Sequence, residues 1–249
     1  MQHETLISRL AVLALLVLPA TQAAADNFIV FGASGEIGGA IVEEALSRGH
    51  DVLGVSRDPA RLNNDHANFS GARGDVTDVD SIVELVPGAD AVIIAVAGVG
   101  ADNSPDSATT FRAASAYIEA AGRLGDDAPH VIQVGGGTTL FTNGQWGLTD
   151  PELAPEPGTP RHGQYFGHWQ AIEAYQASEG VTWTVLSGNR GAMQPGERTG
   201  RYRLGHDETL FDSQGGTFLS TPDYAIAVID VAENHEPIGR RAAVGPPLE

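Results

Sequence analysis

Residues 28–39 restrict the fold of this chain more than any other segment does. They read FIVFGASGEIGG, and the four apolar residues at the start are typical of a strand that is covered on both faces of a parallel sheet. The glycines that follow lead into a helix, whose apolar face is predicted from the spacing of Ile37, Ile41, Val42, Ala45 and Leu46. A strand, a glycine turn and a helix in this order open a βαβ unit. The sequence therefore predicts an α/β protein with a doubly wound, Rossmann-like parallel sheet.

The three spaced glycines of this segment predict a nucleotide site. Gly32 permits a tight turn, Gly35 lets the backbone approach a bulky anion, and Gly38 lets the helix pack closely against the strand. Free N–H groups and the helix dipole then favour a pyrophosphate at the helix N-terminus. The alternative is a glycine turn with a structural role alone, but the strand and helix around it favour dinucleotide binding. The residues expected to surround the pyrophosphate are Gly32, Ala33, Ser34, Gly35, Glu36, Ile37 and Gly38.

The composition excludes several kinds of chemistry. The chain contains no cysteine and no lysine, which excludes disulfides, thiolate metal sites, cysteine nucleophiles, Schiff-base lysines and a P-loop lysine. No metal site is predicted. Acidic residues outnumber basic ones by 32 to 14, and a formal charge of −18 would repel a phosphate backbone, so no nucleic-acid partner is expected. A length of 249 residues suits a single α/β domain.

Residues 1–25 have the features of a secretory signal peptide. Arg9 precedes an apolar run at 10–18, and three alanines at 23–25 form a small-residue cleavage site. This run is shorter than the roughly 20 residues that span a membrane, so no stable membrane anchor is expected. Glu4, together with the cytosolic habitat of nicotinamide cofactors, favours the alternatives of a mis-assigned start or a retained N-terminal helix. We predict a signal peptide at 1–25 and an NAD(P)-binding domain at 26–249, periplasmic or secreted if the signal is real and cytoplasmic otherwise.

The end of the second expected strand, residues 51–55, indicates which cofactor is preferred. NAD sites usually place a carboxylate here for the ribose 2′-hydroxyl, whereas this chain has Ser56 followed by Arg57. A guanidinium suits a 2′-phosphate, and Arg61 could add a second charge, so NADP(H) is expected to be preferred with NAD(H) possible. The alternative is a surface arginine that pairs with Asp58.

The remaining pattern predicts how the sheet continues. Strands are expected at 69–73, 91–96, 131–134, 181–186 and 241–244, and helices at 107–124, 165–178 and 222–234, with a further helix ending at 86 and capped by Thr77 or Asp78. Residues 140–163 are expected to be a lid or binding loop, and residues 202–219 a hairpin in a small C-terminal cap. Asp75 could accept a hydrogen bond from the adenine amino group. The further residues expected to contact the cofactor are Val76, Ala95, Val96 and Ala97.

At this point the chain resembles the atypical short-chain dehydrogenase/reductases, specifically the NADH-flavin reductase-like family related to NmrA-like proteins and biliverdin-IXβ reductases. The likeness covers residues 27–245, and its carriers are FGASGEIG at 31–38, GHDV at 49–52, SRDPARL at 56–62, GDVTD at 74–78, GADAVI at 88–93 and PGERTGRYRLG at 195–205. The last of these points to the flavin-reductase-like branch. The resemblance implies that the glycine turn holds the pyrophosphate, that Arg57 meets the 2′-phosphate and that Asp75 and Val76 bracket the adenine.

Catalysis cannot follow the common short-chain mechanism, which uses a Tyr-x-x-x-Lys pair. Tyr165 is followed at that spacing by Trp169 in place of lysine. The atypical branch also lacks the Tyr-x-x-x-Lys pair, so this difference fits the resemblance. The candidate catalytic residues are Thr138, Tyr165 and His168, and a histidine with a pKa near its ordinary 6.5 could donate a proton. Each has a structural alternative: Thr138 as a turn cap, Tyr165 as packing beneath a lid, and His168 as a solvated helix residue.

Two functions remain open from the sequence. The first is an NADPH-dependent reductase of a small-molecule acceptor such as a flavin or quinone. The second is a non-catalytic NAD(P)-binding sensor of the NmrA-like kind. An epimerase or dehydratase is disfavoured because such chemistry needs a strong tyrosine base. The sequence does not predict the oligomeric state.

Overall fold

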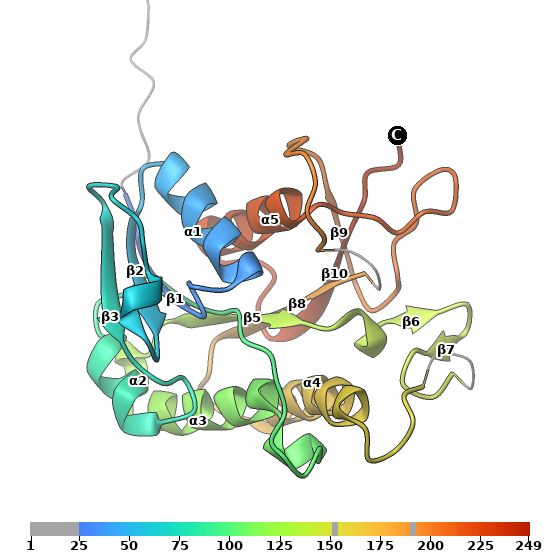
Figure 1. Ribbon diagram of the computed structural model, residues 1–249, viewed down its shortest axis with the longest axis horizontal. Helices are drawn as coiled ribbons and strands as arrows, with labels where there is room; N and C mark the ends of the chain where they lie inside the picture. Colours follow the sequence, from blue (N-terminus) through green and yellow to red (C-terminus); the bar gives the residue numbers. More distant parts are fainter. Residues whose placement is uncertain (1–24, 151–153, 190–192) are drawn as a thin grey trace, which may run out of the picture.

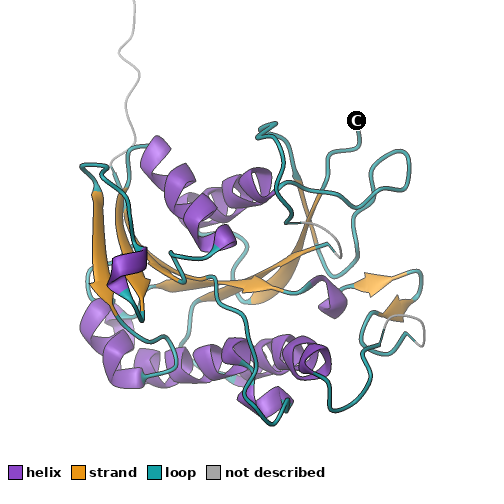
Figure 2. Cartoon of the chain, in the orientation of Figure 1, coloured by secondary structure: helices purple, strands orange, loops and turns teal. Residues whose placement is uncertain are grey.

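The fold is a sheet between two layers of helices. The computed structural model describes residues 25–150, 154–189 and 193–249. Within these residues, eight strands form one sheet, and helices cover both of its faces (Figures 1 and 2). The strands are β1 (Asn27–Phe31), β2 (Asp51–Ser56), β3 (Phe69–Arg73), β4 (Ala91–Ile94), β5 (His130–Gly135), β8 (Trp183–Gly188), β9 (Arg203–Gly205) and β10 (Arg240–Gly245). The predicted α/β class is confirmed.

The order of the strands places a crevice at the carboxyl edge of the sheet. The order is β3-β2-β1-β4-β5-β8-β10-β9, and all neighbours are parallel except β9, which runs antiparallel to β10. The chain winds outward from β1 in one direction to β3 and in the other direction from β4. The boundary between β1 and β4 is therefore the topological switch point, beside which doubly wound sheets bind their ligands.

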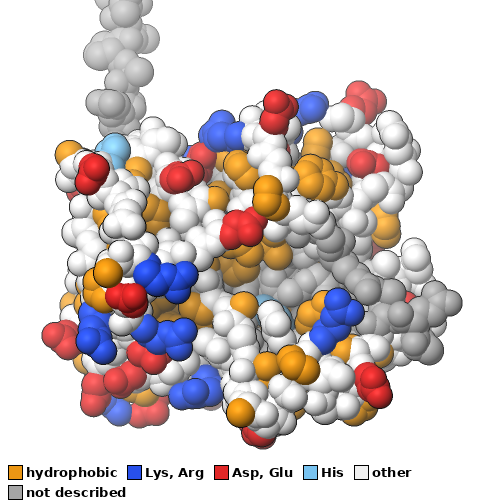
Figure 3. Space-filling model, viewed as in Figure 1, with side chains coloured by type: hydrophobic (Ala, Val, Ile, Leu, Met, Phe, Trp, Pro, Cys, Tyr) orange, Lys and Arg blue, Asp and Glu red, His pale blue; other side chains and the backbone are white. Residues whose placement is uncertain are grey.

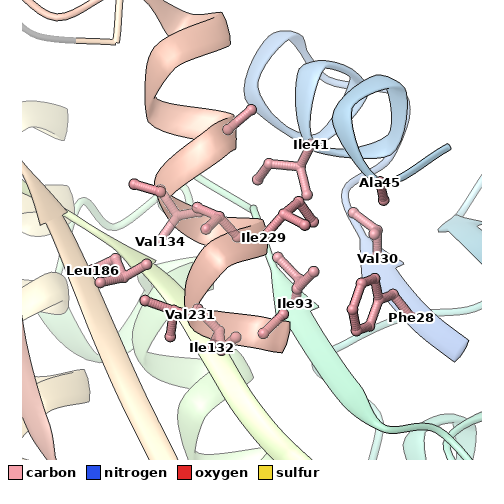
Figure 4. Packing of buried hydrophobic residues seen from close by; sticks show 14 of the residues in the cluster. Phe28, Val30, Ile41, Ala45, Ile93, Ile132, Val134, Leu186, Ile229 and Val231 are labelled. Carbon is pink, nitrogen blue, oxygen red and sulfur yellow. The ribbon is translucent and has the colours of Figure 1, made fainter. Parts of the chain in front are cut away.

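Each face of the sheet has its own helices and its own core. The helices α1 (Glu36–Ser47) and α5 (Thr221–Asn234) cover one face, whereas α2 (Val79–Leu85), α3 (Thr109–Leu124) and α4 (Pro160–Ala177) cover the other (Figure 1). Figure 4 shows Ile41 of α1 and Ile229 of α5 meeting Val30, Ile93 and other strand residues in the first core. Burial of each such side chain stabilises the fold by about 1.5–3 kcal/mol. Of the face predicted for α1, Ile41, Val42, Ala45 and Leu46 are buried and Ile37 is half-buried.

The structure differs from the expected helix start, loop content and hairpin in three places outside the central strands. Helix α4 begins at Pro160, five residues earlier than expected, because Thr159 caps it by accepting a hydrogen bond from the His162 N–H at 3.2 Å. The expected loop at 140–163 therefore includes the start of α4, and it also contains the short antiparallel pair β6 (Phe141–Thr142) and β7 (Gln145–Trp146). Residues 202–219 form no hairpin: β9 pairs with β10, so this segment extends the edge of the main sheet.

Two buried carboxylates anchor the run at 195–205. Asp223 of α5 accepts hydrogen bonds from the Thr199 N–H at 2.8 Å, the Thr199 hydroxyl at 2.6 Å and the Gly200 N–H at 2.9 Å. Glu44 of α1 accepts two hydrogen bonds of 2.9 Å from Arg198 and one from Arg48. Burial would raise the pKa of Glu44, but its bonds to Arg198 and Arg48 lower it instead. The run is thus fixed across the helices α1 and α5.

Within the described ranges, no helix combines the length and the apolar character that a membrane crossing needs. The predicted signal peptide lies outside these ranges except for Ala25.

Candidate dinucleotide and acceptor site

The glycine turn after β1 leaves no room for side chains at two of its positions. Gly32 has φ +86°, and a Cβ there would lie 2.2 Å from the carbonyl oxygen of Ala95. A Cβ at Gly38 would lie 2.1 Å from the carbonyl oxygen of Gly32, which shows how closely α1 packs on the turn. Both distances are far below van der Waals contact, so these positions require glycine. The turn and packing roles predicted for Gly32 and Gly38 are confirmed.

Gly35 differs from the other two glycines because it faces outward at the start of α1. It is the N-cap of that helix, it is exposed, and no side chain caps the helix at this end. A Cβ at Gly35 would approach only the Gly32 carbonyl oxygen, at 3.3 Å. The N-terminus of α1 therefore presents backbone donors and a positive dipole end to whatever lies in the crevice, which suits a pyrophosphate.

Two cavities meet at this turn. One, of about 480 Å³, lies over the ends of β1, β2 and β3, and the other, of about 440 Å³, lies over the ends of β4 and β5. Gly35 and residues 95–97 line both of them, so the two halves form one groove along the carboxyl edge of the sheet. The space-filling view shows basic side chains gathered at the lower left of this face, where Figure 1 places β2, β3 and α2 (Figure 3).

The first cavity is basic. Arg57, Arg61 and Arg112 line it together with Ser56, whose hydroxyl lies 3.3 Å from that of Ser34 in the glycine turn. Among the described residues none of these arginines forms an ion pair. The alternative pair of Arg57 with Asp58 is not formed, and the Asp58 carboxylate accepts a hydrogen bond from the Ala60 N–H. Three guanidinium groups are thus available to donate hydrogen bonds to a ligand.

Asp75 supplies a carboxylate to the same cavity, where Val76 also lies. Its Oδ1 accepts hydrogen bonds from the Thr77 N–H at 2.9 Å and the Thr77 hydroxyl at 2.8 Å. Partial burial would raise the pKa of Asp75, but these two bonds and the charges of Arg57 and Arg112 lower it below its ordinary value. Asp75 is therefore ionised at neutral pH and can only accept hydrogen bonds.

The second cavity brings the three candidate catalytic residues together. Thr138 lies in a short 3-10 helix after β5 (Gly137–Thr139), and Tyr165 and His168 lie one turn apart on α4. The Thr138 hydroxyl is buried and has no hydrogen-bond partner among the described residues. Tyr165 is half-buried, with the Arg161 guanidinium 5.8 Å from its ring centre. Unsatisfied buried hydroxyls are rare, which marks Thr138 as a place where a ligand can bond.

The expectation that His168 titrates near pH 6.5 is wrong. The ring is buried against Gly136, where an added Cβ would lie 3.0 Å from its Cδ2, and this burial lowers the pKa of His168 to about 4. The imidazole is therefore neutral at pH 7. It can form a hydrogen bond with the substrate that accepts the hydride, but it is not an imidazolium that could protonate that substrate. Its burial also excludes the alternative of a solvated helix residue.

Sequence reasoning missed some residues that line the groove. Asn189 follows β8 at the carboxyl edge, a position that could have been recognised, but its side chain accepts from the Leu210 N–H and donates to the Leu210 carbonyl oxygen. Arg112 belongs to α3 and reaches the first cavity only through the packing of that helix. No local pattern in the sequence places Arg112 beside Asp75. Gln164 and Met193 line the second cavity.

A profile of NAD(P)H-binding proteins matches residues 32–235. The chain belongs to this NAD(P)H-binding family. The predicted likeness to the NmrA-like and flavin-reductase-like proteins is confirmed by this match and by solved structures. A candidate NADH-flavin reductase of Streptococcus pneumoniae is 25% identical, with 90% of this chain and 100% of that chain covered and a TM-score of 0.73.

Two further solved structures are similar to this chain over most of their length. A candidate epimerase of Bacteroides thetaiotaomicron is 28% identical, with 90% of this chain and 98% of that chain covered and a TM-score of 0.76. A candidate exported protein of Burkholderia pseudomallei is 30% identical, with 88% and 99% covered and a TM-score of 0.72. A nicotinamide cofactor and an oxidoreductase-like scaffold follow from the family, whereas the acceptor does not.

Proposed function

We propose that the protein is an NADPH-preferring reductase of a flavin, quinone or similar conjugated acceptor. The observation that carries the proposal is the groove made of two unlike cavities that meet at Gly35. One cavity holds three arginines without ion pairs among the described residues, and the other holds the polar side chains of Thr138, Tyr165 and His168. This arrangement fits a cofactor that is phosphorylated at one end and reactive at the other.

The residues present fit the dinucleotide along the whole groove. Arg57 and Arg61 would hold the 2′-phosphate, and the exposed N-terminus of α1 would hold the pyrophosphate. The small side chains of Ala95 and Ala97 leave room for a ribose between the two cavities. When bound, the nicotinamide supplies the hydride.

The chain itself would orient the acceptor and limit access of water. A flavin or quinone becomes a delocalised anion on reduction, which solvent can protonate, so no strong side-chain acid is needed. This agrees with the properties of the second cavity, because His168 is neutral there and the chain has no lysine to activate Tyr165. Hydrogen bonds from Thr138, Tyr165 and His168 would position the acceptor carbonyl or ring nitrogen.

Oxidation of NADPH, followed by its absorbance with a panel of free flavins and quinones, tests the proposal. Turnover that saturates with one acceptor class is the expected result. Binding of NADPH without turnover of any acceptor would contradict it and would favour the second candidate, an NmrA-like sensor. That candidate is supported by the burial of His168, which lowers the pKa of the imidazole to about 4, so the second cavity offers no imidazolium that could act as an acid at neutral pH.

We further propose that the protein is exported. The apolar run and the alanines at 23–25 support this, and the related Burkholderia pseudomallei structure is described as a candidate exported protein.

A further inference from the structure

Arg112 is placed to bind a ligand, although neither its sequence context nor the family match assigns it a role. It lies near the start of α3 and lines the first cavity. Among the described residues, the only hydrogen bond of its side chain is a long one, 3.4 Å from Nη2 to the Thr77 hydroxyl. Arg123 on the same helix instead forms ion pairs of 2.7 Å with Asp80 and 2.6 Å with Glu119. In a chain with 32 acidic residues, an arginine that is left unpaired at a cavity has donors to spare for a ligand.

Asp75 and Arg112 are held side by side through Thr77. The Thr77 hydroxyl accepts from Arg112 and donates to Oδ1 of Asp75 at 2.8 Å, and the charge of Arg112 acts on Asp75 directly. Both bonds from Thr77 fall on Oδ1, so Oδ2 is left to accept from a ligand. The cavity therefore presents the Asp75 carboxylate, which can only accept hydrogen bonds, next to the Arg112 guanidinium, which can only donate them.

This pattern complements adenine and opposes bases that carry an oxygen at position 6. Adenine presents its 6-amino donor beside a ring-nitrogen acceptor, so the amino group can meet Asp75 while the ring nitrogen meets Arg112. Guanine and hypoxanthine carry a carbonyl oxygen where adenine has the amino group. That oxygen would face the Asp75 carboxylate without a proton between them, which is costly in a partly buried site.

We propose that Arg112 contacts the ring nitrogen of the adenine whose amino group is already expected to meet Asp75, so that the two residues together select adenine at the nucleoside end of the dinucleotide. The inference rests on the proposed NAD(P)H-dependent function and adds a specificity-determining role for Arg112. In this role Arg112 contacts the base, whereas Arg57 and Arg61 contact the 2′-phosphate. The three arginines of the cavity therefore divide into two functions that can be separated by experiment.

Calorimetric titration with NADPH, NADH and nicotinamide hypoxanthine dinucleotide phosphate tests this division. The unaltered chain should bind NADPH at least about tenfold more tightly than the hypoxanthine analogue, the effect of one hydrogen bond to a charged group. Asp75→Asn should abolish this preference, because an amide can turn its NH₂ toward the oxygen at position 6. Arg112→Ala should weaken NADPH and NADH equally, by about tenfold, because both carry adenine.

Arg123→Ala is the matched control on α3, and it should leave all three affinities unchanged. Thermal unfolding of each variant verifies that it is folded. Loss of NADPH affinity alone in Arg112→Ala would make Arg112 a 2′-phosphate contact and overturn the inference, as would no loss at all or a preference for adenine that survives Asp75→Asn. If the unaltered chain binds none of the three dinucleotides, the proposed function itself fails.

Discussion

Removal of the Arg57 guanidinium should separate the two nicotinamide cofactors. Arg57 is exposed, lines the basic cavity and forms no ion pair within the described part of the chain. Its replacement by alanine should therefore change the free energy of unfolding by less than about 0.5 kcal/mol. The substitution removes one of the two charges that we expect to meet the 2′-phosphate. NADH lacks that phosphate, so its affinity should not change.

The size of the effect follows from the exposure of the site. Hydrogen bonds to charged groups contribute about 1.5–3 kcal/mol, and the exposure of Arg57 to water puts its contribution near the lower limit. We therefore expect Arg57→Ala to weaken NADPH by about tenfold. Arg61 lies in the same cavity, so the double variant should lose up to about a hundredfold if the two arginines act independently.

The assay is a fluorescence titration of NADPH and NADH against each variant at fixed ionic strength. Arg73→Ala is the control: Arg73 pairs in register with Ser56, beside Arg57, but does not line the cavity. It reports the loss of one nearby charge without the loss of a contact. Equal weakening of NADH and NADPH by Arg57→Ala would refute the assignment of Arg57 to the 2′-phosphate.

Four further predictions concern catalysis, stability and processing. Thr138→Ala, Tyr165→Phe and His168→Ala should each lower turnover by less than about a hundredfold, because general acid catalysis is not essential; a loss above about a thousandfold in Tyr165→Phe, with unchanged NADPH affinity, would indicate carbonyl reduction. Burial lowers the pKa of His168 to about 4, so the folded state binds fewer protons than the unfolded state between pH 6.5 and 4, and stability is lost as the pH falls through that window. Urea unfolding at pH 7 and at pH 5 should therefore show that the free energy of unfolding falls by about 2 kcal/mol less in His168→Gln than in the unaltered chain. Equal decreases in the two proteins would contradict this. Asp223→Ala should lower the free energy of unfolding by about 1.5–3 kcal/mol, since it removes the hydrogen bonds that a buried carboxylate accepts from Thr199 and Gly200, and a urea midpoint that does not move would be inconsistent with the anchor. Intact mass of protein from its native source should show a chain that begins near Asp26, whereas soluble protein that retains Met1 would argue against export.

Much of the central sheet could be predicted because its signals are local. The apolar run at 28–31, the glycine turn and the apolar spacing of α1 lie next to one another in the sequence, and parallel strands that are buried on both faces have a distinct composition. The positions of Gly32 and Gly38 followed from the same segment. Even the start of α4 was marked locally, by Thr159 and Pro160, although the proline-rich context hid it.

The parts that were not predicted depend on distant contacts. Strand β9 exists through its pairing with β10, which lies about 40 residues later in the chain. No pattern in residues 203–205 predicts that pairing. Arg112 reaches Thr77, beside Asp75, because α3 packs against α2, and His168 loses its ordinary pKa because its ring is enclosed against Gly136. Such properties arise from the tertiary environment, which sequence spacing does not encode directly.

The anchoring of residues 195–205 affects how relatives should be compared. Of the motifs that carry the family resemblance, this run is the one that points to the flavin-reductase-like branch. Its residues Arg198, Thr199 and Gly200, however, donate hydrogen bonds to Glu44 of α1 and Asp223 of α5. A protein can keep every one of these contacts while the side chains over the ends of β5 and α4 are exchanged for others. Sequence identity in residues 195–205 is therefore evidence of a shared fold and not of a shared acceptor. Proteins that reduce different substrates, or catalyse other reactions, could have the same residues in this run.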